Sequence, residues 1–370
     1  MTRPRPTDVA VVELGGRGGI FEHAVFVARE VAARGYTVAM HSADLAEGDL
    51  GPANLCRCAP LRDRAPRLPR VMLALKLLSK TVPHLFRSFR RASVTHLHGT
   101  LRLPLTILIL TLARVGGSRV IYSPHNLFVR NGGRFATRVL HLALRLAHEV
   151  IVYSAADVSS LHGTGLHVHQ VDLLHSSTAF EPDEHLVSQW GERLGPRPVV
   201  LLPGFIRADK NPELFVRAIS DLDGVSGWVI GEDHGAANAA RAAAARHGDR
   251  VRVLETRLDH EEFVALLSAA DLVVCPYAVA SQSGVLSIAR DLGVRTLASS
   301  VGGLPELADA VFDPIDAESL AAAVRRSLDQ HHQIERPTRS IKATVDQLVE
   351  IFGLAPPRIS AGADARPPRT

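Results

Sequence analysis

The sequence predicts an α/β protein made of two Rossmann-like domains that face one another across a cleft. Two successive series of short apolar strands alternate with amphipathic helices, a pattern typical of parallel sheets covered by helices. A proline- and glycine-containing break, Gly195-Pro196-Arg197-Pro198, separates the two series, and a glycine loop follows the first strand of each. The length of 370 residues also fits two domains.

The first series begins with an apolar strand that runs into Gly15-Gly16-Arg17-Gly18-Gly19. A dinucleotide-binding fingerprint would need glycine at position 21, where Phe21 stands, so NAD binding is not favoured. In this series we expect strands at 8–14, 36–41, 93–99, 119–122 and 149–154, and helices at 21–34, 102–115 and 135–147.

The second series contains a strand, a polar glycine loop at 281–284, a helix, a strand and a second glycine loop at 302–303. A helix that begins in such a loop presents amide N–H groups and a partial positive charge to an anion such as phosphate. A well-capped helix in an ordinary strand–helix–strand unit is the alternative. Here we expect strands at 199–203, 227–230, 251–254, 270–277 and 294–299, and helices at 213–222, 236–247, 260–269, 282–292, 318–328 and 340–352.

The positive charge is concentrated in the first half of the chain. Residues 1–180 hold 22 lysines and arginines against 11 acids, whereas residues 181–370 hold 20 against 27. Residues 62–91 alone carry nine basic side chains and one acid, with apolar residues between them. This stretch predicts basic amphipathic helices at 70–80 and 85–91 that rest on an anionic membrane surface, although a solvated basic face is the alternative. Nucleic acid is not an expected partner, because no recognition module is present and aromatic residues make up 5%.

The cysteines and apolar runs favour a cytoplasmic protein. Three cysteines form no disulfide or zinc pattern, and glycines come too early for a signal peptide. The longest apolar run, Leu103–Ala113, is too short to span a bilayer. We therefore expect cytoplasmic localisation, with peripheral attachment to the inner face of the membrane.

Three histidines, His96, His98 and His125, fall at strand ends, where open parallel sheets bind ligands. The spacing of His96 and His98 suits a metal, but no third ligand with fitting spacing lies nearby in the sequence. We therefore expect no metal site.

Several segments of the second series match one family in order and spacing. They are Gly204–Pro212 with its Lys-Asn pair, Val229–Glu232, Ala269–Pro276 and Ser299–Glu306. These segments resemble the donor domain of retaining glycosyltransferases of family 4, which have the GT-B architecture. In the first series, Gly18-Gly19 with Glu22-His23, and Ser123-Pro124-His125, resemble the family's glycine loop and its active-site histidine segment. The resemblance spans most of residues 10–310.

The chain departs from the family at one helix. The family usually has two glutamates eight positions apart there, and this chain has Ser281 and Ala289. Because of this departure, neutral groups in place of carboxylates would have to contact the sugar and the ribose.

The resemblance implies transfer of a sugar from a nucleoside-diphosphate sugar, with retention of configuration and without metal or other cofactor. His125 would contact the transferred sugar, while Arg207 and Lys210, three positions apart in one loop, would stabilise the leaving diphosphate. A structural His125, a solvated Arg207–Lys210 pair and a helix-capping Glu306 are the alternatives. Donor contacts are expected from Gly18, Gly19, Gly204, Gly231, Tyr277, Gln282, Ser283, Gly284, Val285 and Glu306.

The resemblance also implies how the domains are used. Residues 1–180 would form the acceptor-side domain and residues 181–338 the nucleotide-sugar donor domain. Residues 339–354 would cross back to the first domain, and residues 355–370 would be a disordered tail.

The acceptor would be a glycan, a lipid-linked molecule or a small molecule, in synthesis of cell-envelope polysaccharide, glycolipid or another glycoconjugate. A sugar-nucleotide 2-epimerase of the same fold and a non-catalytic nucleotide-sugar-binding homologue are the alternative functions. An epimerase of this kind normally carries several carboxylates in its cleft, and this chain offers few there.

Overall fold

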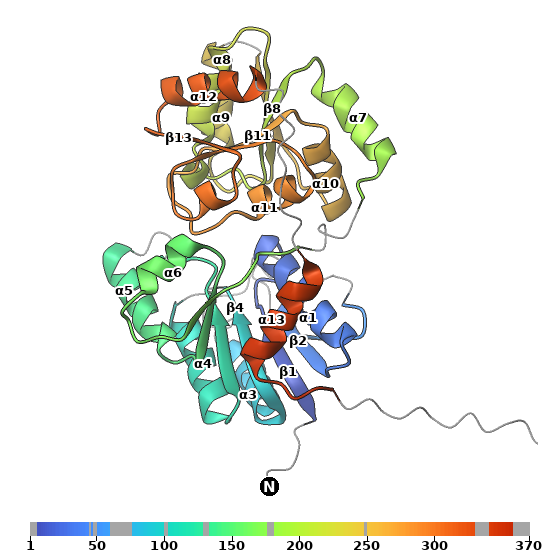
Figure 1. Ribbon diagram of the computed structural model, residues 1–370, viewed down its shortest axis with the longest axis vertical. Helices are drawn as coiled ribbons and strands as arrows, with labels where there is room; N and C mark the ends of the chain where they lie inside the picture. The colour runs from blue at the N-terminus through green and yellow to red at the C-terminus, as the bar shows by residue number, and fades with distance from the viewer. Residues whose placement is uncertain are drawn as a thin grey trace, which may run out of the picture.

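The chain folds into two α/β domains, each with a parallel sheet covered by helices on both faces (Figure 1). The structure is a computed structural model that describes residues 6–43, 46, 50–59, 76–99, 103–128, 133–175, 181–247, 250–329 and 340–357. The predicted fold class is confirmed.

The first domain has a seven-stranded sheet whose strands are all parallel, in the order β3-β2-β1-β4-β5-β6-β7. Its strands are β1 (Thr7–Val12), β2 (Val38–Ala43), β3 (Asn54–Ala59), β4 (Ala92–His98), β5 (Arg119–Ser123), β6 (Glu149–Val152) and β7 (Val168–Gln170). Its helices are α1 (Gly19–Ala33), the π-helical turn η2 (Leu77–Thr81), α3 (Val82–Arg91), α4 (Leu103–Val115), α5 (Gly133–Leu144) and α6 (Ala155–Leu161).

Side chains of this sheet alternate between two cores because successive residues of a strand point to opposite faces. Val9 and Val11 of β1 belong to the core on the α1 face, and Val12 belongs to the core with residues of α3, α4 and α5. Both faces of the sheet are therefore buried, as expected for a parallel sheet.

The second domain has a six-stranded parallel sheet in the order β10-β9-β8-β11-β12-β13, packed in one continuous core. Its strands are β8 (Val199–Pro203), β9 (Ser226–Gly231), β10 (Val251–Glu255), β11 (Leu272–Cys275), β12 (Thr296–Ser299) and β13 (Ala310–Phe312). Its helices are α7 (Glu184–Leu194), η4 (Ala208–Lys210), α8 (Pro212–Ser220), α9 (Ala237–His247), α10 (His260–Ser268), α11 (Gly284–Asp291), η5 (Leu304–Glu306) and α12 (Ala317–Asp329).

The strand order of each sheet reverses at one position. In the first sheet β1 lies between β2 and β4, and in the second β8 lies between β9 and β11. At such a switch point the loops that leave the two central strands diverge and open a binding position at their carboxyl ends. The glycine loops after β1 and β8 both leave from these positions.

The last helix, α13 (Ile341–Phe352), returns to the first domain and lies beside α1 (Figure 1). Val345, Leu348 and Phe352 are buried in the core that α1 also forms, and Arg34 Nε donates to Asp346 Oδ1 at 3.1 Å.

Several elements were missed from sequence, namely β3, β7, β13, α6 and α7. Of the predicted basic helices, residues 70–75 lie outside the described residues, and Lys76 leads into η2 and α3. The predicted tail also lies outside them from residue 358 onward. Among the described helices, none combines the length and the apolar composition needed to cross a bilayer.

Candidate active site

The glycine loops of the two domains face each other. Gly18 has φ 78°, and a Cβ placed on it would lie 3.3 Å from the Phe205 ring of the other domain. Arg17 Nη1 lies 3.8 Å from Glu232 Oε1 across the same boundary. A Cβ on the neighbouring Gly19 would meet nothing within 4 Å. The predicted loops at the two switch points are therefore brought together.

Lys210 lies at the centre of the second-domain loops. Its side chain is buried, its Nζ donates to Pro203 O at 3.4 Å, and it lies 5.1 Å from the centre of the Tyr277 ring. A Cβ on Gly204, which has φ 85°, would lie 3.1 Å from Lys210 Nζ and 3.6 Å from Val285 Cγ2. A cation is thus held beside a glycine backbone and the start of α11.

Arg207 belongs to the same loop but is paired differently. Its Nε and Nη2 donate to the two carboxylate oxygens of Asp209 at 3.1 and 3.3 Å. A bidentate pair of this kind fixes the guanidinium plane and offsets part of its charge.

The start of α11 contains the predicted polar loop. Ser283 Oγ accepts the N–H of Leu286 at 3.3 Å, so Ser283 caps the helix. Gln282 Oε1 is buried, and it has no hydrogen-bond partner among the described residues. A Cβ on Gly284 would lie 3.2 Å from Nε2 of His175, a residue of the segment between the domains. Buried polar atoms without partners are rare in folded proteins, and each calls for an explanation such as a ligand.

Gly231 has a structural role in shaping these loops. A Cβ at this position would lie 2.0 Å from Gly204 O, so only glycine allows the end of β9 to approach the loop after β8.

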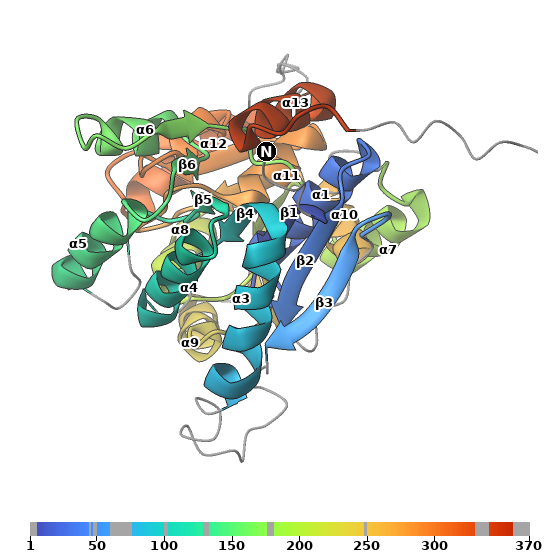
Figure 2. The same ribbon diagram turned by 90° about the horizontal axis from the view of Figure 1, so that it is seen from below.

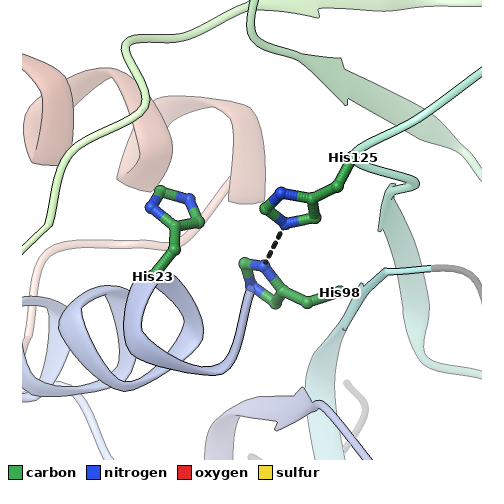
Figure 3. Close-up of side chains that lie close together, drawn as sticks. All are labelled: His23, His98 and His125. Atoms are coloured by element: carbon green, nitrogen blue, oxygen red, sulfur yellow. Dashed lines mark hydrogen bonds between the residues drawn. The ribbon is translucent and has the colours of Figure 1, made fainter. Parts of the chain in front are cut away.

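Three histidines of the first domain converge below this region, His23 from α1, His98 from β4 and His125 from the loop after β5 (Figure 3). His23 Nδ1 donates to Leu174 O at 2.6 Å, and its Nε2 lies 3.1 Å from the Tyr153 hydroxyl. The same hydroxyl is 3.5 Å from His125 Nε2.

The histidines form a hydrogen-bonded chain that ends at His125. Ser123 Oγ and His96 Nε2 are joined at 2.8 Å, His96 Nδ1 and His98 Nε2 at 3.1 Å, and His98 Nδ1 and His125 Nε2 at 3.3 Å. Each neutral imidazole carries one N–H, so all bonds of the chain can run in either direction. His125 Nδ1 is therefore an acceptor in one direction and a donor in the other.

Burial keeps these imidazoles neutral at neutral pH. Loss of hydration lowers the pKa of His23 to about 4 and that of His96 to about 3, and the neighbouring histidines add to the effect at His96. The pKa values of His98 and His125 are also well below the usual value, first through burial and then through the other histidines.

His125 combines two unusual properties. Its φ of 61° lies in the left-handed region, which costs free energy for a side chain other than glycine. Its Nδ1 is buried and has no hydrogen-bond partner in the described part of the chain. The backbone of Leu127 donates to Ser281 Oγ at 3.1 Å, which places this loop against the loop of Gln282. We call His125, His175, Lys210, Gln282 and Gly284 the interdomain site.

Spacing along the sequence did not reveal that His23 and His125 approach His98, and the expectation of no metal site stays a prediction. One ligand atom each from His23, His98 and His125 lie within 4.8 Å of one another, because α1 and the loop after β5 meet at the end of β4. The hydrogen bonds described above account for the same close approach without an ion. Tyr153 and His175 also contact His23, and neither was predicted from sequence to belong to the cluster. His23 alone had a sequence signal, as a polar residue on the apolar face of α1.

The carboxylate of Glu306 contacts the first domain. Its two carboxylate oxygens accept the N–H groups of Ala155 and Ala156 at 2.8 and 3.0 Å, at the first turn of α6 in the other domain. The alternative of a helix cap describes this geometry, and the helix that it caps belongs to the opposite domain.

Two parallel-sheet domains whose switch-point loops face each other define the GT-B architecture. Residues 197–330 match the family model described as glycosyl transferases group 1, which covers most of the second domain. No curated protein sequence matches the chain significantly.

Solved structures show the same fold over most of the chain. HepE of Anabaena, solved in complex with UDP and glucose, has a TM-score of 0.73 at 16% identity, covering 94% of this chain and 99% of HepE. Sucrose-phosphate synthase from Thermosynechococcus elongatus has a TM-score of 0.68 at 19% identity, covering 94% and 96%. WaaG, a glycosyltransferase involved in lipopolysaccharide biosynthesis, has a TM-score of 0.63 at 17% identity, covering 94% and 96%. These comparisons confirm the GT-B fold.

Proposed function

We propose that the protein transfers a sugar from a nucleoside-diphosphate sugar to an acceptor at the interdomain site, with retention and without a metal ion. The observation that carries this proposal is the convergence of a buried lysine, a helix start and two polar atoms that have no hydrogen-bond partner among the described residues, where the loops of two switch points meet. A cation and amide donors suit a diphosphate, and neutral imidazole and amide groups suit sugar hydroxyls.

The leaving diphosphate would lie against Lys210 and the start of α11. As the bond from the anomeric carbon to the phosphate oxygen breaks, its electron pair stays with the diphosphate, whose negative charge grows. Lys210 supplies a positive charge, and the amides of Gly284 and Val285 belong to a first helical turn, where intrahelical acceptors are lacking. Arg207 contributes through a guanidinium that it shares with Asp209.

His125 would face the transferred sugar. Its neutral Nδ1 can accept from a sugar hydroxyl or donate to a sugar or phosphate oxygen, according to the direction of the hydrogen-bonded chain. Gln282 Oε1 would accept from a second hydroxyl, the role that a carboxylate has in the family.

Uridine diphosphate sugars are the first donors to test. One similar structure contains UDP with glucose, and another is a UDP-forming α,α-trehalose-phosphate synthase from Burkholderia xenovorans. The proposal for this chain is a UDP-hexose or a related nucleotide sugar.

The surface of the first-domain helices supports the proposal that the acceptor lies at a membrane. The described part of the basic stretch exposes Lys76, Lys80, Arg87, Arg90 and Arg91 on η2 and α3. Helices α3, α4 and α5 follow one another along one face of the sheet (Figure 2), and Phe135 and Leu142 of α5 are exposed. Exposed basic and apolar side chains on the helices of one face suit an anionic lipid surface.

Product analysis tests the proposal. Purified protein is incubated with UDP-hexoses and with glycan, lipid-linked and small-molecule acceptors, in the presence of a chelator and well below its unfolding temperature. We expect a glycosylated acceptor with the anomeric configuration of the donor, at an unchanged rate with chelator. An inverted product, or activity that chelator abolishes and Mg²⁺ restores, contradicts the mechanism. Conversion of the donor to its 2-epimer without transfer identifies the epimerase, and donor binding without turnover identifies the non-catalytic homologue.

A further inference from the structure

A second group of metal-ligating side chains lies in the first domain, away from the interdomain site. His41 lies on β2, Cys56 on the neighbouring β3 and His84 on α3. The strand register pairs Cys56 directly with His41, so their side chains share one face of the sheet. One ligand atom from each of the three residues lies within 4.8 Å of the others.

The two imidazoles have the spacing of ligands to one ion. His84 Nε2 lies 3.3 Å from His41 Nδ1, and the ring planes are inclined by 69°. Two nitrogens bound tetrahedrally at about 2.0–2.1 Å from Zn²⁺ would lie about 3.3–3.4 Å apart. The rings therefore need little movement to share a metal.

A hydrogen bond on the far side of His41 orients its ring. His41 Nε2 lies 2.7 Å from the hydroxyl of Ser88 on α3. When Nε2–H donates to this hydroxyl, Nδ1 carries the lone pair and lies on the side of His84. Metal-binding histidines are almost always oriented by such a bond from the second ring nitrogen.

We propose that His41, Cys56 and His84 form a binding site for a transition metal ion of borderline softness, with Zn²⁺ the ion that two imidazoles and one thiolate favour. Water would complete the tetrahedron, since these three side chains leave one position open. Cys56 and His84 are partly exposed, which gives the ion a route of entry. The ion would tie the basic helix α3 to the β2–β3 edge of the sheet, and it takes no part in sugar transfer.

The simplest alternative is a hydrogen bond from His84 Nε2–H to His41 Nδ1 with a free thiol nearby. Cobalt titration separates the two because tetrahedral Co²⁺ bound to a thiolate has a charge-transfer absorption that imidazole ligands alone cannot produce. The histidines at the interdomain site therefore cannot imitate the signal.

The experiment titrates Co²⁺ into the metal-stripped full chain and then displaces it with Zn²⁺. We expect one thiolate-bound Co²⁺ per chain, loss of the absorption in Cys56→Ser, and full retention in the matched control Cys58→Ser, two positions along the same strand. His84→Ala should weaken Co²⁺ binding by at least about tenfold, and it provides a second variant with a partly exposed side chain if Cys56→Ser folds poorly. Zn²⁺ should raise the Tm of the wild type and of Cys58→Ser but not of Cys56→Ser. Absence of the thiolate absorption in the wild type, or its persistence in Cys56→Ser, overturns the proposal.

Discussion

Two buried atoms, His125 Nδ1 and Gln282 Oε1, have no hydrogen-bond partner among the described residues. Each costs the empty protein free energy, because burial removes the water that would otherwise bind it. His125 adds the cost of a left-handed backbone. At the residue scale, this arrangement is typical of a binding site whose ligand completes the hydrogen bonds.

Replacing Gln282 by alanine separates stability from binding. We expect Gln282→Ala to keep or raise the free energy of unfolding, since the desolvated oxygen is removed, and to weaken donor binding by about 1–2 kcal/mol. Urea unfolding and donor titration measure the two effects, with the exposed Gln189→Ala on α7 as control. Donor binding equal to that of the wild type would show that the sugar does not contact this loop.

At the scale of elements, the two domains are joined by loops that cap or contact the opposite domain. Glu306 accepts from the first turn of α6, and Ser281 accepts from Leu127 N–H. Arg290 Nη1 of α11 donates to the Glu306 carbonyl at 3.2 Å, which links this cap to the helix of the interdomain site. The geometry assigns Glu306 to domain contact.

The variant Glu306→Gln tests this assignment. It keeps one acceptor oxygen but removes the negative charge at the start of α6. We therefore expect the free energy of unfolding to fall by about 0.5–1 kcal/mol, and hydrogen exchange at the amides of Ala155 and Ala156 to become faster. Glu318→Gln, at the first turn of α12 within the second domain, is the control and should leave those amides unchanged. Donor affinity should stay within about threefold of the wild type. A donor affinity lowered by more than about tenfold would show that Glu306 contacts the donor.

The basic helix α3 gives a prediction about membranes. We expect the full chain to cosediment with anionic vesicles but not with neutral ones, and less so as salt rises. Replacing Arg87, Arg90 and Arg91 by alanine should lower the affinity by about 100-fold, at about 1 kcal/mol per charge. Arg246→Ala, on the exposed end of α9, is the control. Equal binding to both kinds of vesicle, or none, would leave α3 as a solvated surface.

Most elements of the fold follow from local patterns, but the site only partly does. The strand Val199–Pro203 was predicted to the residue because it is an apolar run bounded by a proline and a glycine. The short edge strands β7 and β13 were missed because three residues with one or no buried side chain carry no periodic signal. The roles of His175 and Glu306 depend on contacts between residues more than 100 positions apart, which spacing along the sequence cannot reveal.

For the whole molecule, the buried neutral histidines make the free energy of unfolding depend on pH. The pKa of His23 falls to about 4 and those of His41 and His96 to about 3 in the folded state, mainly through burial, whereas an unfolded histidine titrates near 6.5. Below pH 6.5 the unfolded chain therefore binds protons that the folded chain cannot. Stability from these groups is complete above pH 6.5 and is lost as the pH falls toward 3–4.

Urea unfolding between pH 7 and pH 5 measures this loss. Each buried histidine should contribute up to about 1.4 kcal/mol per pH unit, and His96→Gln should make the slope shallower by one such contribution. Gln189→Ala, an exposed variant on α7 that removes no titratable group, is the control and should leave the slope unchanged. A free energy of unfolding that stays constant over this range contradicts the burial of neutral imidazoles.

We expect a nucleoside diphosphate to bind where the domains meet, with Lys210 against its phosphates. Calorimetric titration of UDP, GDP and ADP into the full chain tests it most directly, in the wild type, Lys210→Ala, Arg207→Ala and the exposed control Arg217→Ala on α8. We expect that at least one nucleotide binds and that Lys210→Ala weakens its binding by about 10- to 100-fold, through loss of a charge-assisted contact of about 1.5–3 kcal/mol. Arg207→Ala should cost less because Asp209 already shares its guanidinium, and Arg217→Ala should bind like the wild type. Binding of none of the three nucleotides, or equal binding by Lys210→Ala and the wild type, would show that Lys210 does not hold a nucleoside diphosphate.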